Sequence, residues 1–126
     1  MRVLLRIITI FFFSIFLGGC QDAFQDSEQV KACELAALSK LKHPDSYDAD
    51  KVTEKTDGQG KRVIQINFKA WNDYKVPIPH GLTCVVNSSA GPDGVIQFSA
   101  IYWNNRPIRI HELDDINESL RTGVWQ

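Results

Sequence analysis

The chain of 126 residues lacks the side-chain groupings that most catalytic and metal sites require. Its three histidines, His43, His80 and His111, are far apart, and none has a partner at the spacing typical of metal ligands. The chain contains no Gly-x-Ser-x-Gly motif, no glycine-rich phosphate loop and no His-Glu-x-x-His. These absences disfavour hydrolase, nucleotide-binding and metalloprotease chemistry, so we expect no catalytic residues, no metal and no cofactor.

Positive charge and long apolar runs are also scarce. Apart from Lys61 and Arg62 there is no cluster of basic residues, and the formal net charge is −1. Nucleic-acid binding is disfavoured, because neutralising a phosphate backbone needs a basic patch. The apolar segment at residues 7–17 is too short to cross a bilayer, which needs about 20 residues. A permanent transmembrane helix is therefore the weaker interpretation of this segment.

The N-terminal segment has the composition of a signal peptide. Arg2 and Arg6 give it a positive start, residues 7–17 are almost entirely apolar, and two glycines follow. A segment with this order of charge, apolar centre and small residues is removed from the mature protein. We therefore exclude residues 1–19 from the fold.

The run Leu17-Gly18-Gly19-Cys20 resembles the lipobox of bacterial lipoproteins. The resemblance implies cleavage before Cys20, a diacylglyceryl thioether on its sulfur, and a membrane anchor of acyl chains such as palmitate. In that family an Asp directly after the cysteine retains the protein in the inner membrane. Here that residue is Gln21, which implies the outer membrane and a domain facing the periplasm. The alternative is an ordinary secretory signal that ends in Cys.

The resemblance also divides the chain and leaves two cysteines to explain. It implies a signal peptide at residues 1–19, a lipidated cysteine and tether at residues 20–26, and a single domain at residues 27–126. With Cys20 lipidated, Cys33 and Cys84 remain, and an even pair in an oxidising compartment most simply forms one disulfide. A catalytic thiol, which would need a histidine nearby, is the alternative.

Residues 27–42 carry the pattern of an amphipathic helix. Asp26 or Ser27 can cap its start, and Pro44 forces the preceding residue out of the α region, so the helix ends near His43. Apolar residues recur on one face at helical spacing, namely Val30, Cys33, Ala37, Leu38 and Leu41.

Four strands are predicted after this helix. The clearest is residues 61–70, because Ile64, Ile66, Phe68 and Ala70 alternate with polar residues. The others are residues 47–56, 82–87 and 95–103, with a loop over residues 71–81 that contains two prolines. A short helix is expected at residues 114–121.

This order predicts an α+β fold, with an N-terminal helix packed on an antiparallel four-stranded sheet, one disulfide and a short C-terminal helix. The disulfide would join the helix to the third strand. The order resembles cystatin-like modules. Residues 41–47 resemble the helix-to-strand junction of small uncharacterised periplasmic lipoproteins, in which a Leu, a Pro and a Ser recur.

Aromatic residues provide the best lead to a binding surface. Alternation places Trp71 on the sheet face opposite Ala70, and it places Trp103 opposite Tyr102 and Phe98. Trp and Tyr dominate protein-binding hot spots. We therefore predict a partner-binding surface made by Trp71, Tyr74, Ile78, His80 and Trp103. In the alternative, Ile108, Ile110 and the C-terminal helix cover this face, since exposed apolar patches are uncommon.

Three functional hypotheses follow. The leading one is a lipid-anchored, non-enzymatic module that binds another envelope protein. A variant is an inhibitor of a periplasmic hydrolase that uses residues 76–80 as a rigid plug, because prolines lower the entropy lost on binding. The second class is an enzyme acting on cell-wall or lipid substrates, which predicts a pocket with convergent titratable groups.

Overall fold

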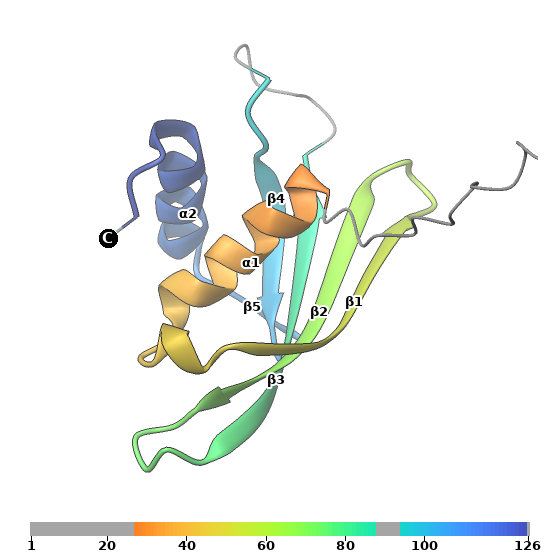
Figure 1. Ribbon diagram of the computed structural model, residues 1–126. Helices are drawn as coiled ribbons and strands as arrows, with labels where there is room; N and C mark the ends of the chain where they lie inside the picture. The colour runs from red at the N-terminus through yellow and green to blue at the C-terminus, as the bar shows by residue number, and fades with distance from the viewer. Residues whose placement is uncertain (1–26, 88–93, 126) are drawn as a thin grey trace, which may run out of the picture.

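The computed structural model describes residues 27–87 and 94–125, so the predicted signal peptide, Cys20 and the tether lie outside the described residues. Figure 1 shows two helices beside one sheet. The elements are, in order, α1 (Glu28–Lys40), the 3₁₀ turn η1 (Pro44–Ser46), β1 (Asp48–Thr56), β2 (Arg62–Trp71), β3 (Pro77–Val86), β4 (Phe98–Trp103), β5 (Arg106–Pro107) and α2 (Ile110–Thr122).

The sheet is an antiparallel meander of five strands in the order β1-β2-β3-β4-β5. The α+β class is therefore confirmed, and the prediction of four strands is wrong. The additional strand arises because the chain reverses after β4 at Asn104 and Asn105, which both adopt positive φ. Two successive residues with positive φ form the tight turns that match the twist of a hairpin, and Asn tolerates that conformation well.

α1 begins and ends where its local chemistry requires. The Ser27 Oγ accepts a hydrogen bond from the Val30 N–H at 3.2 Å, and the helix ends at Lys40, before Pro44. Its buried face consists mostly of small residues, which let the helix lie close to the sheet. These residues are Val30, Ala32, Cys33, Ala36 and Ala37.

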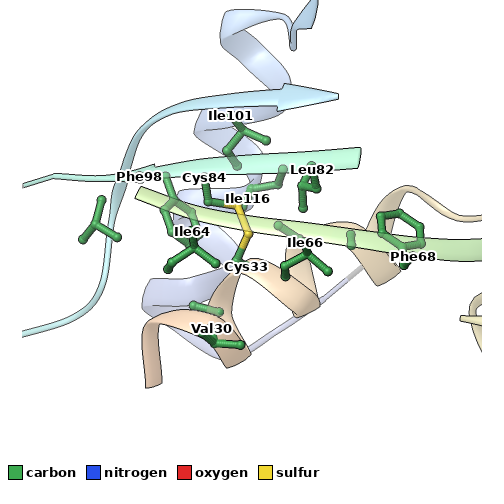
Figure 2. Packing of buried hydrophobic residues seen from close by; sticks show 14 of the residues in the cluster. Val30, Cys33, Ile64, Ile66, Phe68, Leu82, Cys84, Phe98, Ile101 and Ile116 are labelled. Carbon is green, nitrogen blue, oxygen red and sulfur yellow. A yellow bond between two sulfur atoms is a disulfide. The ribbon is translucent and has the colours of Figure 1, made fainter. Parts of the chain in front are cut away.

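The core lies between the helices and one face of the sheet. Along β2 the side chains alternate strictly between buried and exposed, starting at Ile64. Cys33 of α1 and Cys84 of β3 are fully buried and form a disulfide across this layer, as Figure 2 shows. The predicted disulfide is thus confirmed.

β3 is longer than predicted, since Pro77–Gly81 belongs to the strand and the expectation of a loop over residues 71–81 holds only for its first part. Prolines are tolerated here because β4 pairs only with Leu82–Val86. The Gly81 N–H points toward the β4 side, where it donates to the Asn104 Oδ1 at 2.8 Å. At a period of two residues, Pro77 and Pro79 would direct their missing N–H groups to the same free edge.

β4 contains an irregularity that reverses its alternation. Val85 pairs with Ala100 but Val86 pairs with Phe98, so Ser99 is an extra residue in the strand. A bulge of this kind shifts the side chains beyond it to the other face. Phe98 and Ile101 are consequently both buried, whereas Tyr102 is partly exposed. The predicted strand over residues 95–103 is shortened to Phe98–Trp103.

α2 is longer than the predicted range and lies beside α1. Its Ile116 belongs to the same buried cluster as Val30 and Cys33. The Asn117 side chain satisfies both backbone groups of Phe98, because Oδ1 accepts from the N–H at 2.8 Å and Nδ2 donates to the carbonyl at 2.9 Å. α2 therefore covers the β4 part of the core, on the same side of the sheet as α1. The alternative that the C-terminal helix covers the sheet face of Trp71 is wrong. No helix among the described residues is long and apolar enough to cross a membrane.

Candidate functional site

Exposed apolar side chains gather at the loop that joins β2 to β3. We call residues 71–76 the hairpin tip. Trp71 is 44% exposed, Tyr74 is 85% exposed and Val76 is 48% exposed. Exposed large side chains scattered singly over a surface are ordinary, but three within six consecutive residues form a local apolar feature.

Asn72 organises the backbone of the hairpin tip. Its Oδ1 accepts hydrogen bonds from the N–H groups of Tyr74 at 2.9 Å and Val76 at 3.1 Å. Its backbone N–H donates to the Val76 carbonyl, and its carbonyl accepts from the Lys75 N–H, both at 3.0 Å. Asn side chains that bond to nearby backbone in this way imitate a turn. Tyr74 is therefore presented on a loop whose backbone donors are largely satisfied.

The base of the hairpin tip is fixed to the body of the domain. β1 pairs with β2 only as far as Lys69, and η1 takes its place beyond that point. The Trp71 N–H donates to the Ser46 Oγ at 2.8 Å, and the Lys42 Nζ lies 3.0 Å from the Asp73 Oδ2. These contacts hold the end of β2 against the segment that follows α1.

Two of the five predicted binding residues lie at the hairpin tip, namely Trp71 and Tyr74. Ile78, His80 and Trp103 lie on the helix-facing side of the sheet and are partly buried. The prediction that Trp103 lies on the face opposite Phe98 is wrong, because the bulge at Ser99 turns it inward. The predicted surface is thus divided between the tip and the core.

His80 and Trp103 belong to an aromatic cluster below the hairpin tip. The His80 ring centroid lies 5.4 Å from that of Phe68 and 5.3 Å from that of Trp103, and Tyr47 packs on Phe68 at 5.0 Å. The His80 Nδ1 is buried without a hydrogen-bond partner among the described residues. Burial lowers the pKa of His80. The neutral ring consequently serves as packing for the base of the tip.

Asn72 and Lys75 also belong to this site, although the sequence pattern did not predict them. Asn72 directs the loop, and Lys75 adopts a φ of 58°, a left-handed conformation that favours Gly. An available signal was the position of Asn72-Asp73 directly after the alternating strand β2, since these residue types are typical of turns. Reading two prolines as the mark of an extended loop obscured it.

A second feature is an open groove of about 690 Å³ between α1 and α2. Its polar lining includes Lys40, Glu112, Asp115 and Glu118. A hydrogen bond from Lys40 lowers the pKa of Glu112, and a hydrogen bond from Arg121 lowers the pKa of Glu118. Within residues 27–87 and 94–125, no group of three His, Cys, Asp or Glu side chains could hold a metal ion.

No protein-family model, curated protein or solved structure matches this chain. The resemblances to bacterial lipoproteins and to cystatin-like modules therefore stay predictions. What the geometry defines is a disulfide-stabilised α+β domain with an apolar tip on a well-ordered hairpin.

Proposed function

We propose that this protein is a lipid-anchored envelope protein whose domain binds another protein and catalyses no reaction. The exposure of Trp71, Tyr74 and Val76 on one ordered hairpin carries the proposal. Aromatic side chains in a small area are the residues that dominate binding energy at protein interfaces. The role proposed here is therefore that of a recognition module.

The lipobox resemblance at residues 17–20 supports the membrane part of the proposal. A lipid on Cys20 would hold the domain at the periplasmic face of the outer membrane. Because each buried methylene contributes about 0.8 kcal/mol, two or more acyl chains hold a protein on a bilayer almost permanently. Ser27, the first described residue, caps α1 directly, so the described domain begins where the predicted tether at residues 20–26 ends.

Membrane fractionation tests the anchor. We expect the wild-type protein in the membrane fraction, and we expect a Cys20→Ser variant to lose its lipid mass and its resistance to salt extraction. Gln21→Ser is the matched control, since it changes the neighbouring residue and leaves the acceptor cysteine and its lipid mass in place. Acyl mass on the Cys20→Ser protein would contradict the assignment.

Cross-linking of the intact protein in its own membrane, followed by affinity purification, tests the binding role. We expect a discrete adduct with an envelope protein, and we expect its yield to fall when Trp71 is replaced by Ala. Ala substitution of the similarly exposed Leu35 on α1 is the control. The proposal fails if cross-linking of the intact protein gives no discrete protein adduct.

Inhibition of a periplasmic hydrolase is a second form of this proposal. The predicted plug loop at residues 76–80 is wrong, because Pro77–His80 pairs with β2. The observation that favours inhibition is the hairpin tip itself, an ordered element that can enter a cleft. Titration of the full-length protein against lysozyme and envelope proteases tests it. Undiminished hydrolase activity at micromolar concentrations would contradict it.

The hypothesis of an enzyme acting on cell-wall or lipid substrates has less support than the binding role, because the groove between α1 and α2 lacks a suitable general acid among the described residues. A general acid at neutral pH needs a carboxyl group whose pKa is raised, as burial achieves in glycosidases. The pKa values of Glu112 and Glu118 are lowered instead, by Lys40 and Arg121. We therefore assign this groove no catalytic role.

A further inference from the structure

We infer that the hairpin tip inserts its Tyr74–Lys75 apex into an apolar pocket with an acidic rim on a folded envelope protein, at the end of the domain that points away from the anchoring membrane. This inference rests on the proposed function and specifies its partner surface. Three features of the tip support it, namely the side chains that the tip carries, the charge that it leaves unpaired, and its place relative to the tether.

A second loop of the sheet has the same backbone as the tip. In the loop between β1 and β2, the Asp57 Oδ1 accepts from the N–H groups of Gln59 at 2.8 Å and Lys61 at 2.9 Å. The Asp57 N–H donates to the Lys61 carbonyl at 2.8 Å, and its carbonyl accepts from the Gly60 N–H at 3.2 Å. Asn72 makes the same four hydrogen bonds at the tip.

The two loops differ in the side chains that this backbone displays. Where the β1–β2 loop has Gln59 and Gly60, the tip has Tyr74 and Lys75. Gly60 and Lys75 both adopt positive φ, at 79° and 58°, and only Gly does so without strain. The turn therefore requires neither the aromatic ring nor the lysine. The lysine strains the backbone, because a residue with a β-carbon is disfavoured at positive φ.

The apex of the tip also carries a positive charge that is unpaired among the described residues. Asp73, the one acidic residue of the tip, is paired with Lys42 at 3.0 Å, and His43 lies 3.9 Å from its other oxygen. Lys75 makes no ion pair with any described residue. The apex thus combines an exposed ring with one uncompensated positive charge. A pocket with apolar walls and a carboxylate at its rim is complementary to both.

The tip and the start of the domain lie at opposite ends of the molecule. The chain enters the domain at Ser27, whose Oγ lies 2.5 Å from the Glu54 Oε1 near the β1–β2 end of the sheet. The tip lies at the other end of β2, and Figure 1 shows it at the end of the molecule opposite the start of α1. The 10 residues of β2 alone span about 34 Å. Residues 21–26 reach at most ~20 Å in any conformation.

This separation favours a protein over the anchoring bilayer as the occupant. Aromatic and lysine side chains also suit a membrane interface. If the domain stands upright on its tether, however, the length of β2 holds the tip farther from the bilayer than the tether alone can reach. This orientation favours a contact on the periplasmic side of the domain, and a lipid contact is an outcome that the experiment below can detect.

The test uses the full-length lipidated protein in its own membrane, with p-benzoylphenylalanine placed at position 74 or, as control, at position 59 of the β1–β2 loop. Irradiation should give one protein adduct from position 74 and at least tenfold less of it from position 59. Peptide mapping of that adduct should identify a concave apolar site with Asp or Glu at its edge. Adducts to lipid alone, or equal protein adducts from both positions, would overturn the inference.

Affinity measurements with the identified protein complete the test. Tyr74→Gln with Lys75→Gly gives the tip the residues of the β1–β2 loop, so this double variant should fold and should bind at least tenfold more weakly. Lys75→Glu should weaken binding further, whereas Lys61→Glu at the other end should leave it unchanged. Unaltered affinity of the double variant would overturn the inference while leaving the proposed binding role intact. Absence of every protein adduct would remove both.

Discussion

The loops at the two ends of the sheet share one hydrogen-bond pattern and display different side chains. Asp57 and Asn72 direct the two backbones in the same way, through acceptors to the second and fourth residues that follow. Gln59 and Gly60 face solvent at the tether end, whereas Tyr74 and Lys75 do so at the distal end. The comparison distinguishes the residues that the turn requires from those whose side chains the turn only displays to solvent.

The requirements of the turn fall on its first and fourth positions. The first must supply a side-chain acceptor, and the fourth must tolerate positive φ. The residues at the third position face no such constraint, so Tyr74 needs a different explanation from Asn72. Binding is the explanation that we propose, and changes that act on both loops or on one of them test it.

Removal of the disulfide should have the largest effect and should not distinguish the loops. The Cys33–Cys84 bond closes a chain segment with a separation of 51 residues and lies within the core between them. In the chain-entropy model its loss destabilises the fold by about 4 kcal/mol. We expect urea denaturation of Cys33→Ala with Cys84→Ala to show this loss. A stability within about 1 kcal/mol of wild type would mean that packing alone holds α1 on the sheet.

Loss of the directing side chain should have the next largest effect and should be similar at the two ends. Asn72→Ala and Asp57→Ala each remove an acceptor of two backbone N–H groups, which we expect to cost about 1–2 kcal/mol in unfolding free energy. Asn72→Asp and Asp57→Asn, which keep an acceptor, are the controls. Partner binding should weaken only for Asn72→Ala. Equal weakening by Asp57→Ala would break the distinction between the two loops.

Exchange of the fourth residue of the turn should change the unfolding free energy less, and with opposite signs in the two loops. Lys75→Gly relieves a left-handed backbone conformation that costs a non-glycine residue roughly 1 kcal/mol. It also raises the conformational entropy of the unfolded chain, which destabilises the fold by about 0.5 kcal/mol. A net stabilisation of about 0.5 kcal/mol is expected, and Gly60→Lys should destabilise by a similar amount. Thermal unfolding in parallel measures both. Destabilisation by Lys75→Gly would show that the lysine supports the fold, which weakens the case for a binding role.

Much of the fold could be predicted because its signals are periodic. The helical spacing from Val30 to Leu41 and the strict alternation from Ile64 to Ala70 mark α1 and β2. The pairing of Cys33 with Cys84 was predicted because the lipobox resemblance assigns Cys20 to a lipid and leaves these two cysteines. The two periodic patterns depend only on residue type and local spacing, whereas the disulfide, with a separation of 51 residues, depends on the number of cysteines available.

The features that could not be predicted depend on neighbours distant in sequence. The bulge at Ser99 is a matter of register with Val85 and Val86, and it alone decides that Trp103 faces the core. The proline segment of β3 is acceptable only because β4 ends before it. The early start of α2 was missed for a different, local reason. The Glu112 Oε2 accepts from the Arg109 N–H at 2.9 Å, but arginine is not a residue that marks a helix start.

Protonation of His80 should have the smallest effect and should be confined to the distal end. Burial between Phe68 and Trp103 lowers the pKa of His80 below its ordinary value of 6.5, so the unfolded chain binds a proton more readily than the folded one. The stabilisation is complete above pH 6.5 and decreases as the pH falls from there toward the lowered pKa. The difference between wild type and His80→Gln, measured by urea denaturation from pH 7.5 to 5, isolates this term from the carboxylates. Hydrogen exchange should show faster opening at Ile78 and Trp71 below pH 6.5, with little change at Gln59 and Lys61. A uniform acceleration at both loops would mean that the aromatic cluster supports the whole sheet and not the base of the tip.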